Sequence, residues 1–204
     1  MIAWSIRVAK QSSCFSKVIV STEDPEIAKI ANEFDAETPF MRPQSLADDY
    51  INTLDVMRHA VDWAEAEYGE VLSNVCCIYP AAPLIMSTDI TDSLQILQKQ
   101  DCSFVFSAKE YPSPIQRAFK ISKKNRVEMF TPSEFYARSQ DLERAYHDAG
   151  QFYWGKKRAW LTERNIFATD SIPFILGKYR AVDIDWPEDW AFAEAIFNHM
   201  KATE

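Results

Sequence analysis

Short β-branched or aromatic segments alternate along the chain with longer segments of helical spacing, and this alternation is the main indication of the fold. Residues 1–12 have enough apolar positions for a helix that packs on a sheet. The run Lys-Val-Ile-Val-Ser at 17–21 is typical of a short strand. Pro25 and the acidic residues around it are typical of a helix start, so a helix is predicted directly after this strand.

The same pattern repeats in the following part of the chain. After a polar connector at 40–49, apolar residues recur at helical spacing up to Gly69. A strand is predicted at 75–79, followed by a turn at 80–84, a helix, and another strand at 102–107. These strand-plus-helix units predict an α/β fold with a mixed, mostly parallel sheet and helices on its faces.

The helical period fades between residues 109 and 154, where Pro, Ser, Tyr and Arg are frequent. We interpret 109–154 as an irregular, β-rich excursion from the sheet, so that residues 1–204 form a single domain. The regular pattern returns near the end of the chain. A strand is predicted at 179–185, and a helix is predicted to open at Pro187.

Composition and charge exclude several functional classes. The 204 residues include 22 Lys and Arg against 30 Asp and Glu, a net charge of −8, which argues against a nucleic-acid partner. No apolar run reaches the roughly 18 residues of a membrane span, so we expect a cytoplasmic protein without a membrane segment. The four cysteines show no metal-binding spacing, and the four glycines match neither of the glycine-rich phosphate-binding motifs.

The sharpest chemical feature is the run Asp183-Ile184-Asp185 at the end of the last predicted strand. Positions i and i+2 of a strand project to the same face, so the two carboxylates are expected to point together. Paired carboxylates at the carboxyl end of a strand suit Mg²⁺, which binds one or two carboxylates together with substrate phosphates. The structural alternative is that these acids cap the helix that begins at Pro187.

Residues 138–154 form a second chemical feature, because they combine Arg, Gln, His and Asp with aromatic side chains and a glycine. Such a mixture suits a pocket for a polar, anionic sugar, with Arg138 placed to pair with a carboxylate. Gln140, Asp148 and Gln151 are the other candidate contacts to this substrate. A salt-bridged surface followed by a buried Phe-Tyr-Trp strand explains the same composition.

Isolated residues have weaker functional interpretations. Ser21 follows the first predicted strand and is a candidate for contact with a nucleotide, although a hydroxyl there more often caps the next helix. Arg42 is a candidate for contact with phosphate or for pairing with Asp48. Arg117 faces either an anionic ligand or solvent, and His147 is either a general base or a structural residue.

Motifs along nearly the whole chain resemble the acylneuraminate cytidylyltransferase family, whose members activate acidic sugars as CMP conjugates. The motifs that carry this resemblance are MIAWSI, VIVSTEDPEIAKIA, PFMRPQSLADD, CCIYPAAPL, YPSPIQRAF, RSQDLERAYHDAGQFYWG and VDIDWPEDW. The stretch RSQDLERAYHDAGQFYWG is the most specific of them and is similar to the branch that activates pseudaminic acid. The resemblance implies a Rossmann-like nucleotidyltransferase fold of the nucleotide-diphospho-sugar transferase type.

This resemblance also implies a reaction and its partners. CTP and the acidic sugar, a nonulosonic acid, give the CMP-sugar and pyrophosphate, with magnesium on the two acids of the DID motif, Asp183 and Asp185. Sialic, legionaminic and 3-deoxy-octulosonic acids are the alternative substrates. A non-catalytic sugar-binding or assembly protein is the alternative from another class. The family further implies a homodimer with the irregular middle segment at the interface.

Residues of the sugar and nucleotide pocket follow from the same comparison. The YPAAPL segment corresponds to a pocket wall in the family, which assigns Tyr79, Ala81 and Ala82 to that wall. Arg138 and Arg117 are implied to contact the sugar carboxylate or to reach across a dimer.

One family element is not found in the sequence. Family members begin with a strand and a basic loop of the type I-P-A-R-G-G-S-K-x-I-P-x-K-N, which binds the CTP phosphates, before the helix that corresponds to MIAWSI. In these 204 residues Met1 already lies at that helix. We therefore expect that about thirty residues, one strand and its loop, are lacking, through an upstream start codon, a fragment or a degenerate copy.

Overall fold

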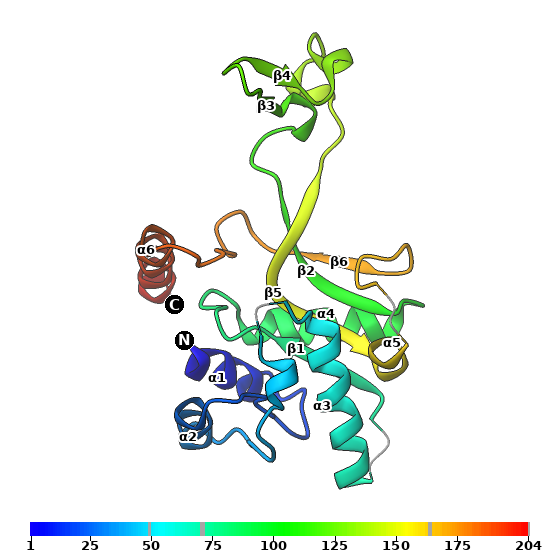
Figure 1. Ribbon diagram of the computed structural model, residues 1–204, viewed down its shortest axis with the longest axis vertical. Helices are drawn as coiled ribbons and strands as arrows, with labels where there is room; N and C mark the ends of the chain where they lie inside the picture. The colour runs from blue at the N-terminus through cyan, green and yellow to red at the C-terminus, as the bar shows by residue number, and fades with distance from the viewer. Residues whose placement is uncertain (49, 70–71, 163–164, 204) are drawn as a thin grey trace.

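A computed structural model describes residues 1–48, 50–69, 72–162 and 165–203, and a four-stranded sheet lies at its centre (Figure 1). The strands lie in the order β1 (Asn74–Ile78), β5 (Tyr146–Lys156), β2 (Phe104–Glu110) and β6 (Ile172–Ile175). β5 is antiparallel to both of its neighbours, whereas β2 and β6 are parallel. β1, β2 and β6 therefore share one direction and β5 runs against them, which confirms the expected mixed sheet, although two of its three pairings are antiparallel.

Side-chain alternation along the strands produces two apolar faces, and helices cover both. Phe152 and Trp154 of β5 point to the face covered by α1 (Ile2–Ser12) and α4 (Ser87–Lys99). Tyr153, between them, points to the face covered by α3 (Thr53–Tyr68) and α5 (Lys157–Leu161). The fold is thus a three-layer α/β/α sandwich.

Helix starts near the amino terminus follow the sequence signals. The Asp24 carboxylate accepts hydrogen bonds from the backbone N–H groups of Glu26 and Ile27 and begins α2 (Pro25–Glu33). Asn52 caps α3 in the same way, and Gly69 ends that helix with a φ of 58°, which glycine adopts without strain. The predicted helices of this part of the chain are therefore confirmed.

The strand predicted at 17–21 is wrong. Ile19 and Thr22 make only isolated parallel bridges, to Glu37 and Met41 respectively. In the part of the chain that the structure describes, this segment pairs on one side only, with residues 37–41, and it does not join the central sheet. A β-branched run without strand neighbours on both sides remains irregular, because its ladder of hydrogen bonds is incomplete.

The strand predicted at 179–185 is also wrong, and the strand that was missed is β6 at Ile172–Ile175. Arg180 donates its backbone N–H to the carbonyl of Gly177, and this turn takes the chain away from the sheet. Residues 182–185 still alternate between buried and exposed positions, because Val182 and Ile184 pack beneath α6 (Pro187–Thr203). The apolar alternation therefore reflects packing against a helix, and it was mistaken for sheet pairing.

The middle of the chain forms a projection on a two-stranded ribbon made of the outer parts of β2 and β5 (Figure 1). Its hairpin consists of the antiparallel strands β3 (Phe119–Ile121) and β4 (Val127–Met129). Single 3-10 turns lie in the projection and in the connector before α3, at η1 (Gln44–Leu46), η2 (Ile115–Arg117), η3 (Pro132–Glu134) and η4 (Ser139–Asp141). The inner part of β5 belongs to the central sheet, so the projecting part ends before residue 154.

Two further findings concern the membrane and the cysteines. Among the described residues, no helix has the length and apolar character that spanning a bilayer requires. Cys14, Cys76, Cys77 and Cys102 are free thiols that lie in or against the apolar core.

Candidate active site

The carboxyl ends of β1, β2 and β6 meet at one edge of the sheet, where β5 begins. Tyr79, the first residue after β1, donates its backbone N–H to the carbonyl of Gln151 at 2.9 Å. Ser107 of β2 accepts hydrogen bonds from the N–H groups of Gln151 and Phe152, each at 3.1 Å. Ligands of open α/β sheets bind at this kind of edge, so it is the candidate active site.

The turn after β1 is anchored by the first helix. Ser5 donates its hydroxyl to the carbonyl of Tyr79 at 3.0 Å, and the Trp4 indole N–H donates to the carbonyl of Ile85 at 3.3 Å. Ala82 is fully buried, while Ala81 is half-buried. These contacts fix the course of the turn, as a pocket wall requires.

Polar side chains link the turn to the start of β5. The hydroxyls of Thr53 and Tyr79 lie 2.5 Å apart, and the rings of Tyr79 and Tyr153 are 5.3 Å apart. Tyr153 in turn donates its hydroxyl to the Asp148 carboxylate at 2.6 Å. Asp148 also accepts from the Gly150 N–H at 3.0 Å, so its carboxylate is held at the edge of the sheet.

Burial raises the pKa of both tyrosines above the usual value of 10. At Tyr153 the hydrogen bond to Asp148 adds to this effect, because the bond exists only while the phenol keeps its proton. The two hydroxyls therefore act as hydrogen-bond donors across the neutral pH range and are unsuited to serve as bases.

Alkaline denaturation tests this network. A phenol whose pKa is raised by folding stabilises the folded state below pH 10, and this stabilisation is lost as the pH rises above 10. We expect Tyr153→Phe to cost about 1.5–3 kcal/mol at pH 7, through loss of a hydrogen bond to a carboxylate. We also expect it to weaken the fall in stability between pH 9 and 11, measured by urea denaturation. Tyr50→Phe, at a residue 95% exposed, should change neither quantity, and parallel pH curves for wild type and Tyr153→Phe would contradict the assignment.

The segment that carries Asp183 and Asp185 packs against the same turn. Ala181 shares an apolar cluster with Ala82, and Val182 shares another with Leu84. Asp183 and Asp185 are exposed, whereas the residues that alternate with them are buried or half-buried. The structure thus brings the two acids and the predicted pocket wall to one edge of the sheet.

At the start of α6, the carboxylate that bonds the backbone is that of Asp189 in the first turn, which accepts from the N–H groups of Asp185 and Trp186 at 3.2 and 2.9 Å. These contacts therefore do not support the alternative that Asp183 and Asp185 cap the helix that begins at Pro187. Their two oxygen-donor groups fit the one or two carboxylates that Mg²⁺ takes alongside substrate phosphates. No cluster of three or more Asp, Glu, His or Cys in the described residues offers a metal site made of protein ligands alone.

Gln151 is buried at this edge and is incompletely bonded. Its amide nitrogen donates to the carbonyl of Ala149 at 2.9 Å. Within the described residues its amide oxygen is buried without a hydrogen-bond partner. Because an unsatisfied buried acceptor costs about 1–3 kcal/mol, this oxygen suits a donor group on a ligand.

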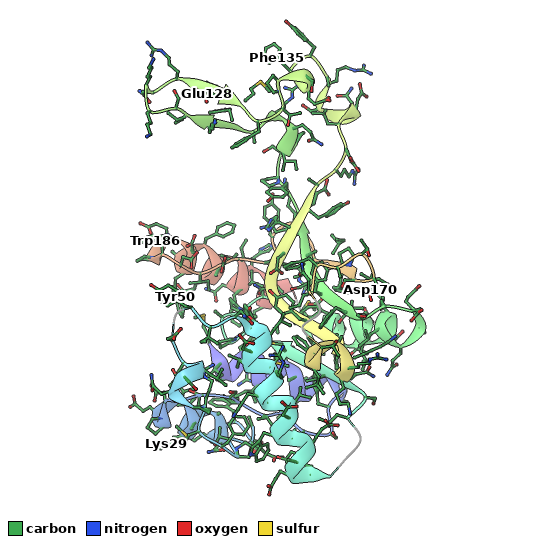
Figure 2. The ribbon with its side chains drawn as sticks, turned by 45° about the vertical axis from the view of Figure 1, so that its right-hand side comes forward. Lys29, Tyr50, Glu128, Phe135, Asp170 and Trp186 are labelled. Carbon is green, nitrogen blue, oxygen red and sulfur yellow. The ribbon has the colours of Figure 1, made fainter. Side chains whose placement is uncertain are left out.

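Three predicted sugar contacts lie in the projection and away from the sheet edge of their own chain. Arg117 donates to the carbonyl of Ala137 at 2.5 Å, and Arg138 pairs with Asp141 at 2.8 Å. Gln140 is exposed in the 3-10 turn η4, between Arg138 and Asp141 in the sequence. Figure 2 shows this part of the molecule, marked by Glu128 and Phe135, at a distance from the helices that cover the sheet.

The remaining predicted residues have local contacts. Arg42 pairs with Glu23 and not with Asp48, and the hydrogen bond lowers the pKa of the Glu23 carboxyl. The Ser21 hydroxyl is buried without a partner in the described part of the chain, while the helix cap is Asp24. Their nucleotide-binding roles stay predictions. His147 lies on the ribbon, with Nδ1 2.7 Å from the Asp148 carbonyl.

Sequence reasoning missed Thr53 and Lys109. Thr53 carried no signal except its position beside the helix cap Asn52. Lys109 extends from the carboxyl end of β2 and donates to the carbonyl of Ala181 at 3.0 Å, two residues before Asp183. Its place at the end of a predicted strand was the only available indication.

Comparisons with known proteins show the family and the fold of the chain. The family model for cytidylyltransferases matches residues 1–199. Pseudaminic acid cytidylyltransferase from Campylobacter jejuni is 37% identical over 204 residues, which cover 99% of this chain and 88% of that protein.

Two solved structures share the fold at low sequence identity, which confirms the predicted nucleotidyltransferase fold. The 4-diphosphocytidyl-2C-methyl-D-erythritol synthase from Anaerococcus prevotii has a TM-score of 0.63 at 13% identity and covers 97% of this chain and 85% of its own. The CMP:2-keto-3-deoxy-manno-octonic acid synthetase complexed with CTP has a TM-score of 0.57 at 12% identity, covering 98% and 88%.

Proposed function

The chain belongs to the cytidylyltransferase family, and from this premise we propose that it activates pseudaminic acid to CMP-pseudaminic acid with release of pyrophosphate. The observation that carries the proposal is the packing of the Asp183–Asp185 segment against the turn after β1, at the carboxyl edge of the sheet. One edge thus combines acidic groups for a metal–phosphate complex with a fixed wall for base and sugar. The reaction belongs to the cytoplasm, where CTP is available.

The residues of this edge divide the reaction between them. The anomeric hydroxyl of the sugar attacks the α-phosphorus of CTP in line with the departing pyrophosphate. Asp183 and Asp185 would hold magnesium, which neutralises charge on the phosphates when bound. The turn at Tyr79, Ala81 and Ala82 orients base and sugar. The unpartnered oxygen of Gln151 accepts a hydrogen bond from the ligand.

The projection carries a set of exposed apolar side chains that fits a second copy of the chain. These residues are Phe119, Ile121, Val127, Phe130, Phe135 and Tyr136, each at least 55% exposed. A two-stranded hairpin is marginally stable alone in water, and an exposed apolar patch marks an interaction surface. A homodimer through this hairpin would bring Arg117 and Arg138 of one copy toward the sugar carboxylate bound by the other.

Solution mass tests the dimer. We expect the wild-type chain to have twice its monomer mass in size-exclusion chromatography with light scattering. Ile121→Asp, on the hairpin at 66% exposure, should give the monomer mass, because burial of a charge opposes association. Ile30→Asp on α2, at 40% exposure, should leave the dimer intact. A dimer that persists in Ile121→Asp would place the interface elsewhere.

Pyrophosphate release tests the reaction itself. The assay contains CTP, Mg²⁺ and pseudaminic acid, with sialic, legionaminic and 3-deoxy-octulosonic acids as parallel substrates at fixed CTP. It uses both this chain and a form to which the basic phosphate-binding loop of the family has been added at the amino end. Release with pseudaminic acid in either form supports the proposal. Release only with another acid would reassign the substrate, and sugar binding without Mg²⁺-dependent CTP binding in both forms would indicate a non-catalytic protein.

A further inference from the structure

We propose that Arg180, clamped by Asp89, is a positioning residue that holds the Asp183–Asp185 segment in place at the sheet edge. This inference rests on the proposed function, because it assigns Arg180 a role for the two acids named there. Arg180 and Asp89 lie outside the motifs that carry the family resemblance. Their proposed role is to fix the backbone that carries Asp183 and Asp185.

Arg180 is joined to two other elements. Its guanidinium forms a two-pronged ion pair with the Asp89 carboxylate, in which Nη1 and Oδ1 lie 3.1 Å apart. Nη2 also donates to the carbonyl of Leu84 at 3.2 Å, in the turn that follows β1. Asp89 is only 5% exposed and also accepts from the backbone N–H of Met86 at 2.8 Å, at the start of α4. A single side chain therefore connects the pocket-wall turn, the amino end of α4 and the acidic segment.

Lys109 of β2 restrains Ala181, the residue that follows Arg180. It donates to the carbonyl of Ala181 from β2, so consecutive residues are held by α4 and by the sheet. Val182 then packs on Leu84, and Asp183 follows directly. Residues 181–185 are irregular and have no ladder of strand hydrogen bonds, so side-chain contacts must fix their position.

Stability alone does not explain this arrangement. A buried ion pair contributes little net stability compared with well-packed apolar residues, because both charges lose their hydration. Asp89 already has a local role, since its carboxylate caps the start of α4 at Met86. The fork of Arg180 adds directionality, because two parallel bonds to one carboxylate fix the orientation of the guanidinium. The pair is therefore better suited to fixing a position than to adding stability.

Hydrogen exchange and metal titration test the inference in the full chain. We compare wild type with Arg180→Lys and Asp89→Asn, which retain the charge and the capping oxygen respectively, and with Arg158→Lys on α5 as the matched control. The expected result is exchange at the amides of 181–186 that is about tenfold faster in the two variants, with α3 unchanged. Mn²⁺ titrated into the CTP complex and followed by electron paramagnetic resonance should bind about tenfold more weakly. Arg158→Lys should match wild type in both measurements.

The outcomes separate this inference from the proposed function. Wild-type exchange at 181–186 in both Arg180→Lys and Asp89→Asn would overturn the positioning role, whatever the metal does. If Asp183→Asn binds Mn²⁺ as tightly as wild type, the metal assignment fails, and the exchange rates still decide whether Arg180 holds the segment. Should Asp89→Asn fail to fold, Arg180→Gln replaces it, because it breaks the two-pronged ion pair while the Asp89 carboxylate still accepts from the Met86 N–H.

Discussion

Replacing Asp183 or Asp185 with Asn is expected to lower the rate of pyrophosphate release by about 100-fold or more, which corresponds to ~2.7 kcal/mol of lost transition-state stabilisation. Both carboxylates are exposed at the carboxyl edge of the sheet beside the pocket-wall turn. Asparagine keeps the size of the side chain but removes the negative charge, so affinity for a hard divalent cation falls. Initial rates at saturating CTP and pseudaminic acid, across a range of Mg²⁺ concentrations, provide the measurement.

Asp62→Asn is the matched control for this experiment. Asp62 is an exposed residue of α3, so the same loss of one charge there should leave the rate within about twofold of wild type. Unfolding by urea should show equal stability for all three variants and wild type, because the replaced groups are exposed. Rates for Asp183→Asn and Asp185→Asn that equal that of Asp62→Asn would remove both acids from the active site.

Replacing Gly155 with Ala is expected to destabilise the protein by about 3 kcal/mol, the upper part of the usual range for overpacking. A Cβ atom at this position would lie 2.5 Å from Nε1 of Trp160 and 2.6 Å from Cε1 of Phe104. Both rings are fully buried and meet edge to face at 5.0 Å, and the Trp160 N–H donates to the carbonyl of Val75. The added methyl must therefore displace a ring or break that hydrogen bond, since the core has no space for it. The midpoint of urea unfolding measures the loss.

Gly177→Ala provides the comparison for Gly155→Ala. A Cβ atom at Gly177 would meet only the aliphatic part of Arg180 at 3.5 Å, an ordinary van der Waals distance. We expect a change of less than about 1 kcal/mol, in either direction. Equal stability losses in the two variants would show that the packing around Gly155 adjusts freely.

The candidate site was only partly predictable. Tyr79, Ala82, Asp183 and Asp185 were assigned from motifs, and the structure places the four at one sheet edge. The reasoning that paired the two acids used a strand that is not there. Their common exposure instead results from apolar neighbours that pack under α6. A burial pattern of period two is produced equally by a sheet and by an extended segment under a helix, so periodicity cannot distinguish them.

Contacts such as the Arg180–Asp89 pair lay beyond sequence reasoning for a different reason. The two residues are 91 positions apart, and neither belongs to one of the motifs that carry the family resemblance. The insertion of β5 between β1 and β2 is a similar case, because its partners are separated from it by the whole projection. Pairing over such distances depends on which apolar faces fit together, and single-residue propensities carry no information about it.

The sequence by itself determined most of the helices, the α/β class and the family. Caps, prolines and helical spacing act within a few residues, so α1 to α4 and α6 begin close to where they were expected. Only the tertiary structure decided which segments join the sheet, how the projection leaves it, and which side chains surround the acids. Those outcomes depend on contacts between distant segments, whose energies arise only when the chain has folded and water has left the interfaces between them.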